Sequence, residues 1–267
     1  MIRKGKGFVA MSVAFVFWSA FVAVSVQASE RTGNLVFETM KKMEDAHKVF
    51  LGDVKQIRER RTAAVAQRDA VKESFRKAKP GSIDRREFHA RFCLEQARVM
   101  GAIREETDLT HQVTASQLGI LKNLYKSIES GRESATPQAV QSILRAAKPV
   151  LEDGRKLLAS LGNYSDKITD PVIHSRLDAA AGTAKMLSNY TANLDKGLAG
   201  NLGTQVDLKR RLADLIQQLN AIYVQTDILS AMIKDKAAVL KMVNELAGAE
   251  AFFSVLAGGK GIVTNLS

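Results

Sequence analysis

Cysteine, proline and aromatic residues are scarce in this chain: one cysteine, four prolines and 6% aromatic side chains among 267 residues. A single cysteine excludes an internal disulfide, and the composition excludes collagen and disulfide-stapled scaffolds. No segment alternates apolar and polar residues with β-branched enrichment, so the sequence predicts no strand. With 46% hydrophobic and 25% charged residues, it is typical neither of a wholly disordered chain nor of a polytopic membrane protein. We therefore expect an all-α protein with one or two globular parts.

The first 28 residues differ in composition from the rest. Three basic residues precede an apolar run from Phe8 to Val26, and Val26-Gln27-Ala28 places small residues where a signal peptidase cleaves. This pattern predicts a signal peptide at residues 1–28, with the rest of the chain exported to the periplasm or beyond. A retained membrane anchor is the alternative, because the apolar run of 19 residues is close to the roughly 20 that span a bilayer. No cysteine follows the run, which excludes a lipoprotein.

Positive charge is concentrated in the first part of the exported chain. The whole chain carries a formal +11, and residues 29–98 hold 17 basic and 11 acidic side chains, a net charge of +6. Residues 99–267 hold 19 and 17, a net charge of +2. A basic segment in an exported protein suggests an acidic partner or an anionic envelope surface, and a solvated helix face is the alternative. Nucleic acid is excluded as a partner, because the compartment is wrong and no aromatic residues interleave with the basic ones.

Turn and capping signals divide the chain into predicted helices. Lys79-Pro80-Gly81-Ser82 reads as a turn, and Thr136-Pro137 and Asp170-Pro171 each pair a capping residue with proline at the first helical position. The resulting helices are residues 34–79, 84–130, 137–161, 171–196 and 205–248, the third of them kinked or split at Pro149. We expect residues 29–131 to form a coiled-coil hairpin and residues 132–267 a smaller helical bundle that ends in a flexible tail.

Heptad patterns support the hairpin. Residues 34–79 carry apolar side chains at alternating spacings of four and three, interrupted by His47, Arg61 and Arg68, and residues 84–130 carry a matching pattern. Folding the chain at Gly81 brings together positions whose numbers sum to 163 or 164. The pairs are Met43 with Ile120, Phe50 with Val113, Ala64 with Val99, Val71 with Phe92, and Phe75 with Phe88.

The same register predicts partners for the polar interruptions. Arg68 falls opposite Glu95 and Gln96, His47 falls opposite Gln117, and Glu106 lies about a turn from Arg61. A charge buried without a partner is costly, so each arginine is expected to pair or to extend to water.

The last predicted helix has the most hydrophobic face and should form the core of the bundle, with the two alanine-rich helices before it packed against this core. Its apolar positions are Leu208, Leu212, Leu215, Leu219, Ile222, Leu229, Ile233, Leu240 and Val243.

Residues that carry chemistry are few and scattered. His89 and Cys93 lie one helical turn apart, which is half of a metal site, but no third or fourth ligand is nearby in the sequence. Cys93 either bridges two copies of the chain or is buried as a small apolar residue. Glu105 and Glu106 are adjacent, so on a helix they do not face each other. The glycines around Lys260 lack the strand and helix of a phosphate loop. We therefore predict no catalytic residue, no cofactor and no metal ligand.

These features favour an exported, non-enzymatic coiled-coil interaction or scaffold protein of a bacterial envelope. Its partners would be other proteins, including further copies of the chain, or the anionic envelope surface through the basic hairpin. One alternative is a helical subunit of an envelope-spanning secretion or conjugation apparatus. The other is a ligand-binding helical sensor, which would need a cluster of polar groups inside the bundle.

Overall fold

The structure is a computed structural model that describes the backbone of residues 8–134, 136–198 and 205–246, and the side chains of residues 35–134, 136–194, 207–243 and 245. Within these residues the chain forms six α-helices and one short 3₁₀ helix, η1, and no strand. The all-α prediction, a long antiparallel hairpin followed by a helical bundle, is confirmed. The elements are α1 (Phe8–Lys77), α2 (Ile83–Glu129), α3 (Pro137–Gly162), η1 (Ser165–Lys167), α4 (Pro171–Leu198), α5 (Gln205–Lys234) and α6 (Lys236–Leu246).

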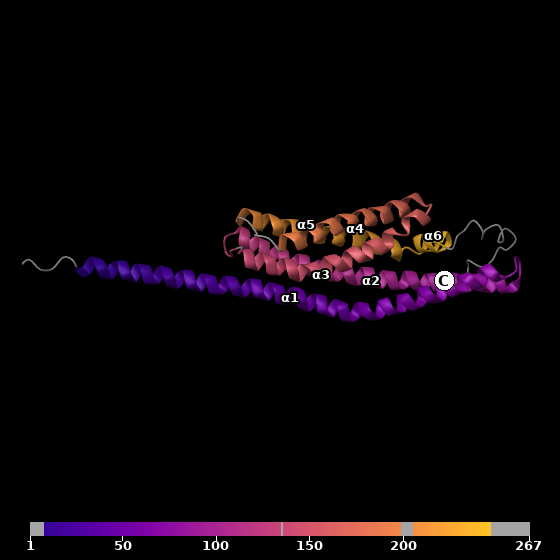
Figure 1. Ribbon diagram of the computed structural model, residues 1–267, viewed down its shortest axis with the longest axis horizontal. Coiled ribbons are helices and arrows are strands. Elements are labelled where there is room, and N and C mark those ends of the chain that lie inside the picture. The colour runs from indigo at the N-terminus through magenta and orange to yellow at the C-terminus, as the bar shows by residue number, and fades with distance from the viewer. Residues whose placement is uncertain (1–7, 135, 199–204, 247–267) are drawn as a thin grey trace, which may run out of the picture.

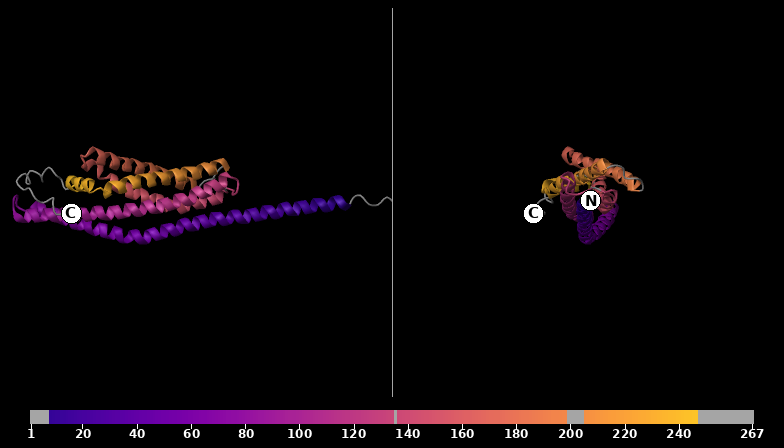
Figure 2. Two further views of the ribbon diagram at one scale, coloured as in Figure 1. Left: turned by 180° about the vertical axis from the view of Figure 1, so that it is seen from behind. Right: turned by 90° about the vertical axis from the view of Figure 1, so that its left-hand side faces the viewer.

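The two longest helices, α1 and α2, lie side by side and form the hairpin (Figure 1). The turn between them relies on Gly81, whose φ of 78° is open to glycine without steric cost. Ser82 then caps α2, because its side-chain oxygen accepts a hydrogen bond from the Arg85 N–H at 3.2 Å. Toward its N-terminal end α1 extends well past the other helices, and the hairpin turn lies at the opposite end of the molecule (Figures 1 and 2).

Helices α3 to α6 pack along one side of the hairpin, and the molecule is elongated, as the left view of Figure 2 shows (Figures 1 and 2). α5 lies against α2, α3 against α1, and α3 and α4 against each other. A single cluster of buried apolar side chains runs from Val36 in α1 to Val243 in α6, so the hairpin and the bundle share a core. The apolar face predicted for α5 is buried along its whole length, from Leu208 to Ile233.

α3 and α4 approach each other closely where Gly162 faces Ala181. A Cβ atom on Gly162 would lie 2.6 Å from the Ala181 Cβ and 2.8 Å from its Cα. The two helices can approach this closely because Gly162 has no side chain. Asp170 begins α4 by accepting hydrogen bonds from the N–H groups of Val172 and Ile173 at 3.0 and 3.1 Å.

The start of α1 and the course of α3 differ from the prediction. α1 begins at Phe8 and not near residue 34, because nothing between the apolar segment and the hairpin breaks the helix. α3 continues through Pro149 without a split, since Ala147, Val150 and Leu151 near it are buried in the core and packing offsets the lost hydrogen bond.

The predicted helix over residues 205–248 is in fact two helices, interrupted at Asp235. The side chain of Asp235 accepts a hydrogen bond from the Ala237 N–H at 2.9 Å and so starts α6. The sequence analysis missed this cap, because the apolar spacing continues across it from Ile233 to Leu240.

Two predictions fall outside what the structure describes. The flexible tail, with Gly258, Gly259 and Gly261, lies in residues 247–267, and the side chains of the predicted signal segment are not among those described. Among the residues that the structure describes, no helix combines the length and the apolar character needed to cross a bilayer.

Candidate functional site

Five ionisable side chains from three helices meet between the hairpin and α3. Arg58 donates from Nε to Glu106 Oε1 at 2.7 Å and from Nη2 to Asp153 Oδ1 at 3.1 Å. Arg61 donates from Nη1 to the other Glu106 oxygen at 2.6 Å, and His47 Nε2 lies 3.0 Å from Asp153 Oδ2. We call this group (His47, Arg58, Arg61, Glu106 and Asp153) the ionic junction. It joins α1 to α2 through Glu106 and α1 to α3 through Asp153.

The charges of the ionic junction are partly or fully buried, so the stability of the fold depends on their pairing. The side chain of Glu106 is only 2% exposed, and both of its oxygens are held by arginines. Burial alone would raise the pKa of Asp153, but the hydrogen bond from His47 and the charge of Arg58 outweigh it and hold this pKa below its usual range. Burial alone would lower the pKa of Arg58, but the hydrogen bonds and charges of Glu106 and Asp153 outweigh it and raise this pKa. The Asp153 carboxylate and the Arg58 guanidinium are therefore stabilised in their charged forms.

Local sequence explains how these side chains come together. His47 and Arg61 occupy positions of the α1 heptad face, and Arg58 lies one turn before Arg61 on the side toward α3. Asp153 is the acidic member of the apolar face of α3, between Val150 and Leu157, which are both buried. An acidic residue on a face that is otherwise apolar needs a buried partner, and this is the signal by which sequence reasoning could have found Asp153.

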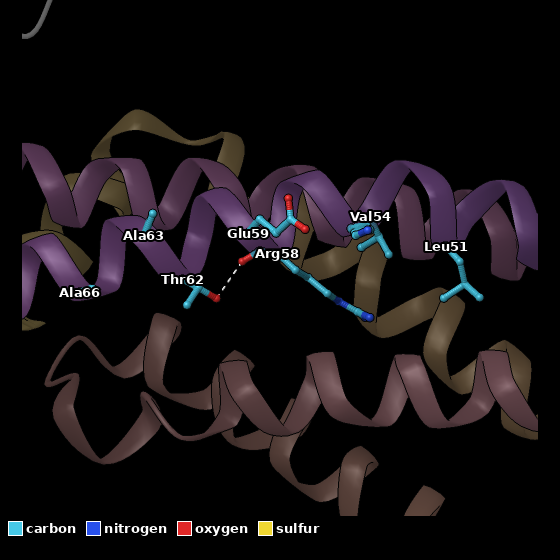
Figure 3. A pocket seen from close by; sticks show the side chains of 8 residues that line it. Leu51, Val54, Arg58, Glu59, Thr62, Ala63 and Ala66 are labelled. Carbon is cyan, nitrogen blue, oxygen red and sulfur yellow. Dashed lines mark hydrogen bonds between the residues drawn. The ribbon is translucent and has the colours of Figure 1, made fainter.

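Two hollows open on the surface above the ionic junction. One, of about 390 Å³, lies between α1 and α3 and is lined by residues that include His47, Lys48, Leu51 and Arg145. The other is an open groove along α1 from Leu51 to Ala66, and Leu51, Arg58 and Thr62 project from the same side of the helix there (Figure 3). Because Leu51 lines both, we treat the two hollows as one surface, the α1 groove.

The α1 groove combines an apolar centre with a basic rim. Leu51 is 43% exposed at its middle. Lys48, Lys55 and Arg145 are exposed around it, and among the described residues none of the three forms an ion pair. Glu44 and Glu59 are the two acidic residues that line the groove.

Two contacts across the hairpin agree with the predicted register. Arg58 reaches Glu106, and Arg68 Nη1 donates to Gln96 Oε1 at 3.2 Å; both pairs satisfy the expected sum. The expected proximity of Arg61 and Glu106 is also confirmed.

Two of the predicted polar pairs are wrong. His47 bonds to Asp153 and not to Gln117, while Gln117 donates to the backbone oxygen of Met43 at 3.2 Å. Glu95 pairs with Arg98 on its own helix at 2.7 Å and not with Arg68. In each case a partner nearer to the side chain, on α3 or one turn along the helix, replaces the one expected across the hairpin.

His89 and Cys93 are close together, as their spacing on α2 predicted. The Cys93 sulfur lies 3.0 Å from His89 Nε2. Burial lowers the pKa of His89 to about 4 and raises the pKa of the Cys93 thiol, so at neutral pH both groups are uncharged. A neutral thiol is a poor nucleophile and a poor metal ligand. In the described part of the chain, no three His, Cys, Asp or Glu side chains are arranged to hold a metal ion.

A second polar cluster, which the sequence analysis did not find, joins α2 to α5. The His111 ring stacks on Tyr223 with centroids 4.3 Å apart, and its Nδ1 lies 3.2 Å from the Thr226 hydroxyl. One turn away, Asp108 accepts a hydrogen bond from Ser230 and pairs with Lys234 at 3.1 Å. These contacts fix how α5 lies along the hairpin.

The chain was also compared with known proteins. No protein family matches it, and no curated protein or solved structure shows significant similarity to it.

Proposed function

We propose that this chain is an exported, non-enzymatic helical scaffold of a bacterial envelope that works by binding another protein along the α1 groove. The observation that carries the proposal is how the ionic junction uses its charges. Its arginines and carboxylates bond one another across α1, α2 and α3, so they hold the helices together and are not directed at a substrate. We therefore assign binding to the outer surface of the elongated molecule.

The α1 groove has the chemistry of a helix-binding surface. An exposed leucine at the centre offers apolar area, and the cations around it favour a partner with acidic residues beside its apolar ones. An amphipathic helix of that kind would lie along α1 with its apolar face on Leu51. The hairpin beneath is held by the ionic junction, so such a partner would meet a preformed surface.

Photo-crosslinking in the native host tests the contact. A photoreactive residue at Leu51 is expected to give a discrete adduct with a partner protein. The same residue at Met186, which is 42% exposed on α4, should give none. In the background Lys48→Glu/Arg145→Glu the Leu51 adduct should be lost, because the basic rim is reversed. Equal adducts at both positions, or an adduct indifferent to charge reversal, would contradict the proposal.

Export is tested separately, with a phosphatase that becomes active only outside the cytoplasm fused to the chain. Residues 1–28 should be required for its activity. An inactive fusion that carries residues 1–28 would contradict export, and activity that persists without them would contradict their role as the signal; neither result bears on the α1 groove.

A ligand-binding sensor is the second candidate, and one observation favours it. The ionic junction is a polar cluster inside the helical assembly, and His47 lines a hollow of about 390 Å³, which is within the usual range for small-molecule sites. Native mass spectrometry of the protein purified gently from its host would show an added small-molecule mass that disappears in Arg145→Ala. A mass equal to that of the chain alone would favour the scaffold.

A further inference from the structure

The most basic surface of the hairpin lies at its turn. Residues 72–91 carry seven basic and three acidic side chains, a net charge of +4, which is most of the +6 carried by residues 29–98. We call these residues the hairpin tip. Figures 1 and 2 show that this end of the molecule, where α1 and α2 meet, projects beyond the ends of α4 and α6.

Little of this charge is neutralised within the tip. Arg76 and Lys77 share the carboxylate of Glu73, each at 3.7 Å, which is a loose and exposed arrangement. Lys79, Arg86 and Arg91 are exposed, and none of them forms an ion pair among the described residues. The tip therefore presents a positive potential outward.

An apolar side chain stands among these cations. Ile83 is 74% exposed, more than any of the other large apolar side chains that the structure leaves exposed. It occupies the first position of α2, directly after the cap at Ser82. The guanidinium of Arg85 lies 4.5 Å from the centre of the Phe75 ring, which braces α2 against α1 next to the turn.

We propose that the hairpin tip binds the surface of an anionic phospholipid membrane, with Ile83 entering the headgroup region and the surrounding cations contacting lipid phosphates. A narrow projecting end fits a flat surface better than it fits the side of a helix. Basic residues near a charged bilayer each add to the attraction, and an apolar side chain adds burial at the interface. This proposal deepens the scaffold function by naming a second surface, but it does not depend on the α1 groove.

A tryptophan placed at the tip reports the contact directly. Trp18 is the single native tryptophan, so Trp18→Phe/Ile83→Trp gives the full chain one reporter, at the tip. With vesicles of phosphatidylcholine and phosphatidylglycerol, its emission should shift to the blue and be quenched by lipids labelled near the headgroup. With phosphatidylcholine alone it should not change. The apolar segment at Phe8–Val26 can enter both kinds of vesicle, and for this reason the readout is the reporter and not total binding.

Charge variants test the mechanism on the same reporter. Lys79→Gln/Arg86→Gln should raise the lipid concentration at half-maximal shift about tenfold or more. The matched control, Lys48→Gln/Lys55→Gln, removes two exposed cations from the middle of α1 and should change it less than about twofold. Circular dichroism of both variants should match that of the parent, because none of these side chains is buried.

Three results would overturn the proposal. The first is an equal shift with neutral vesicles. The second is an equal shift of a reporter at Val49, exposed on the side of α1, which would mean that the molecule lies flat on the membrane. The third is no vesicle response while the tip cations remain necessary in the cell, which would assign the tip to an acidic protein. None of these results bears on crosslinking at Leu51, so the two proposals fail separately.

Discussion

His47 and Asp153 are 106 positions apart in the sequence, and their side chains meet at 3.0 Å between Nε2 and Oδ2. Through this contact and the neighbouring one from Arg58, a single carboxylate fastens α3 to the long hairpin. The buried part of the carboxylate has no water to replace a lost partner. The loss of stability on removing this contact therefore shows how much polar pairing contributes to the fold.

Asp153→Asn should lower the free energy of unfolding by about 2 kcal/mol, because it removes the charge that faces Arg58 in a partly buried site. Urea denaturation followed by circular dichroism measures this. Asp53→Asn makes the same change at an exposed position of α1 and should stay within about 0.5 kcal/mol of the parent. Equal effects of the two substitutions would mean that Asp153 contributes no pairing energy.

Two neighbouring ion pairs allow buried and exposed pairing to be compared at the same distance. Arg60–Glu105 and Arg61–Glu106 are both 2.6 Å long and lie one residue apart on each helix. Arg60 and Glu105 are 61% and 49% exposed, whereas Glu106 is buried. Double-mutant cycles with Arg→Met and Glu→Gln should give a coupling of about 0.5 kcal/mol or less for the exposed pair and about 2 kcal/mol for the buried one. Similar couplings would show that water screens both pairs alike.

Acid should weaken the fold in two separate pH ranges. The pKa of His89 is about 4 in the folded protein and near 6.5 when unfolded, so between these values the unfolded chain binds the extra proton and stability falls as pH falls. The pKa of Asp153 lies below its ordinary value of 3.8, so its contribution is present above that value and is lost as pH falls further.

Denaturant titrations across this pH range separate the two groups. His89→Gln should remove the decline between pH 6.5 and 4, and Asp153→Asn should flatten the decline below pH 3.8. If each variant keeps the full pH dependence of the parent, other groups cause it.

Glycine substitutions should have opposite effects at two positions. Gly162→Ala should destabilise the protein by about 2 kcal/mol, because the new Cβ would lie within 2.6–3.0 Å of Ala181, including its backbone, and α4 would have to move. Gly119→Ala should stabilise it by about 0.5–1 kcal/mol, since nothing lies within 4 Å of that position in α2 and alanine favours helix. Thermal melting of both variants measures the contrast, and a neutral Gly162→Ala would show that α3 and α4 are not tightly apposed.

The features that the sequence predicted correctly are those that depend on local spacing. The caps at Thr136 and Asp170, the hairpin register and the buried face of α5 all follow from short-range pattern, because capping and periodicity act within a few residues. The break at Asp235 was missed since an apolar pattern that continues across a cap gives no warning of it.

The ionic junction was only half predicted, for a different reason. His47, Arg61 and Glu106 stand out as polar residues on apolar faces of the hairpin. Their full set of partners depends on where α3 lies, and α3 begins more than thirty residues after Glu106. Arg58 and Asp153 gain their roles only once that helix is packed, and a single sequence does not contain the packing.

The length of α1 makes it a molecular ruler. Seventy helical residues at 1.5 Å each give a contour of about 105 Å, measured from the start of the apolar segment to the hairpin turn. If that segment is retained in a bilayer, the rod sets how far from the bilayer the tip acts. Seven residues inserted ahead of Leu35, before the bundle begins, would move the tip outward by about 10 Å and leave its rotation about the helix axis nearly unchanged. Inserting five would add about 7 Å and turn the tip by about 140°, so the two insertions would separate a need for reach from a need for orientation.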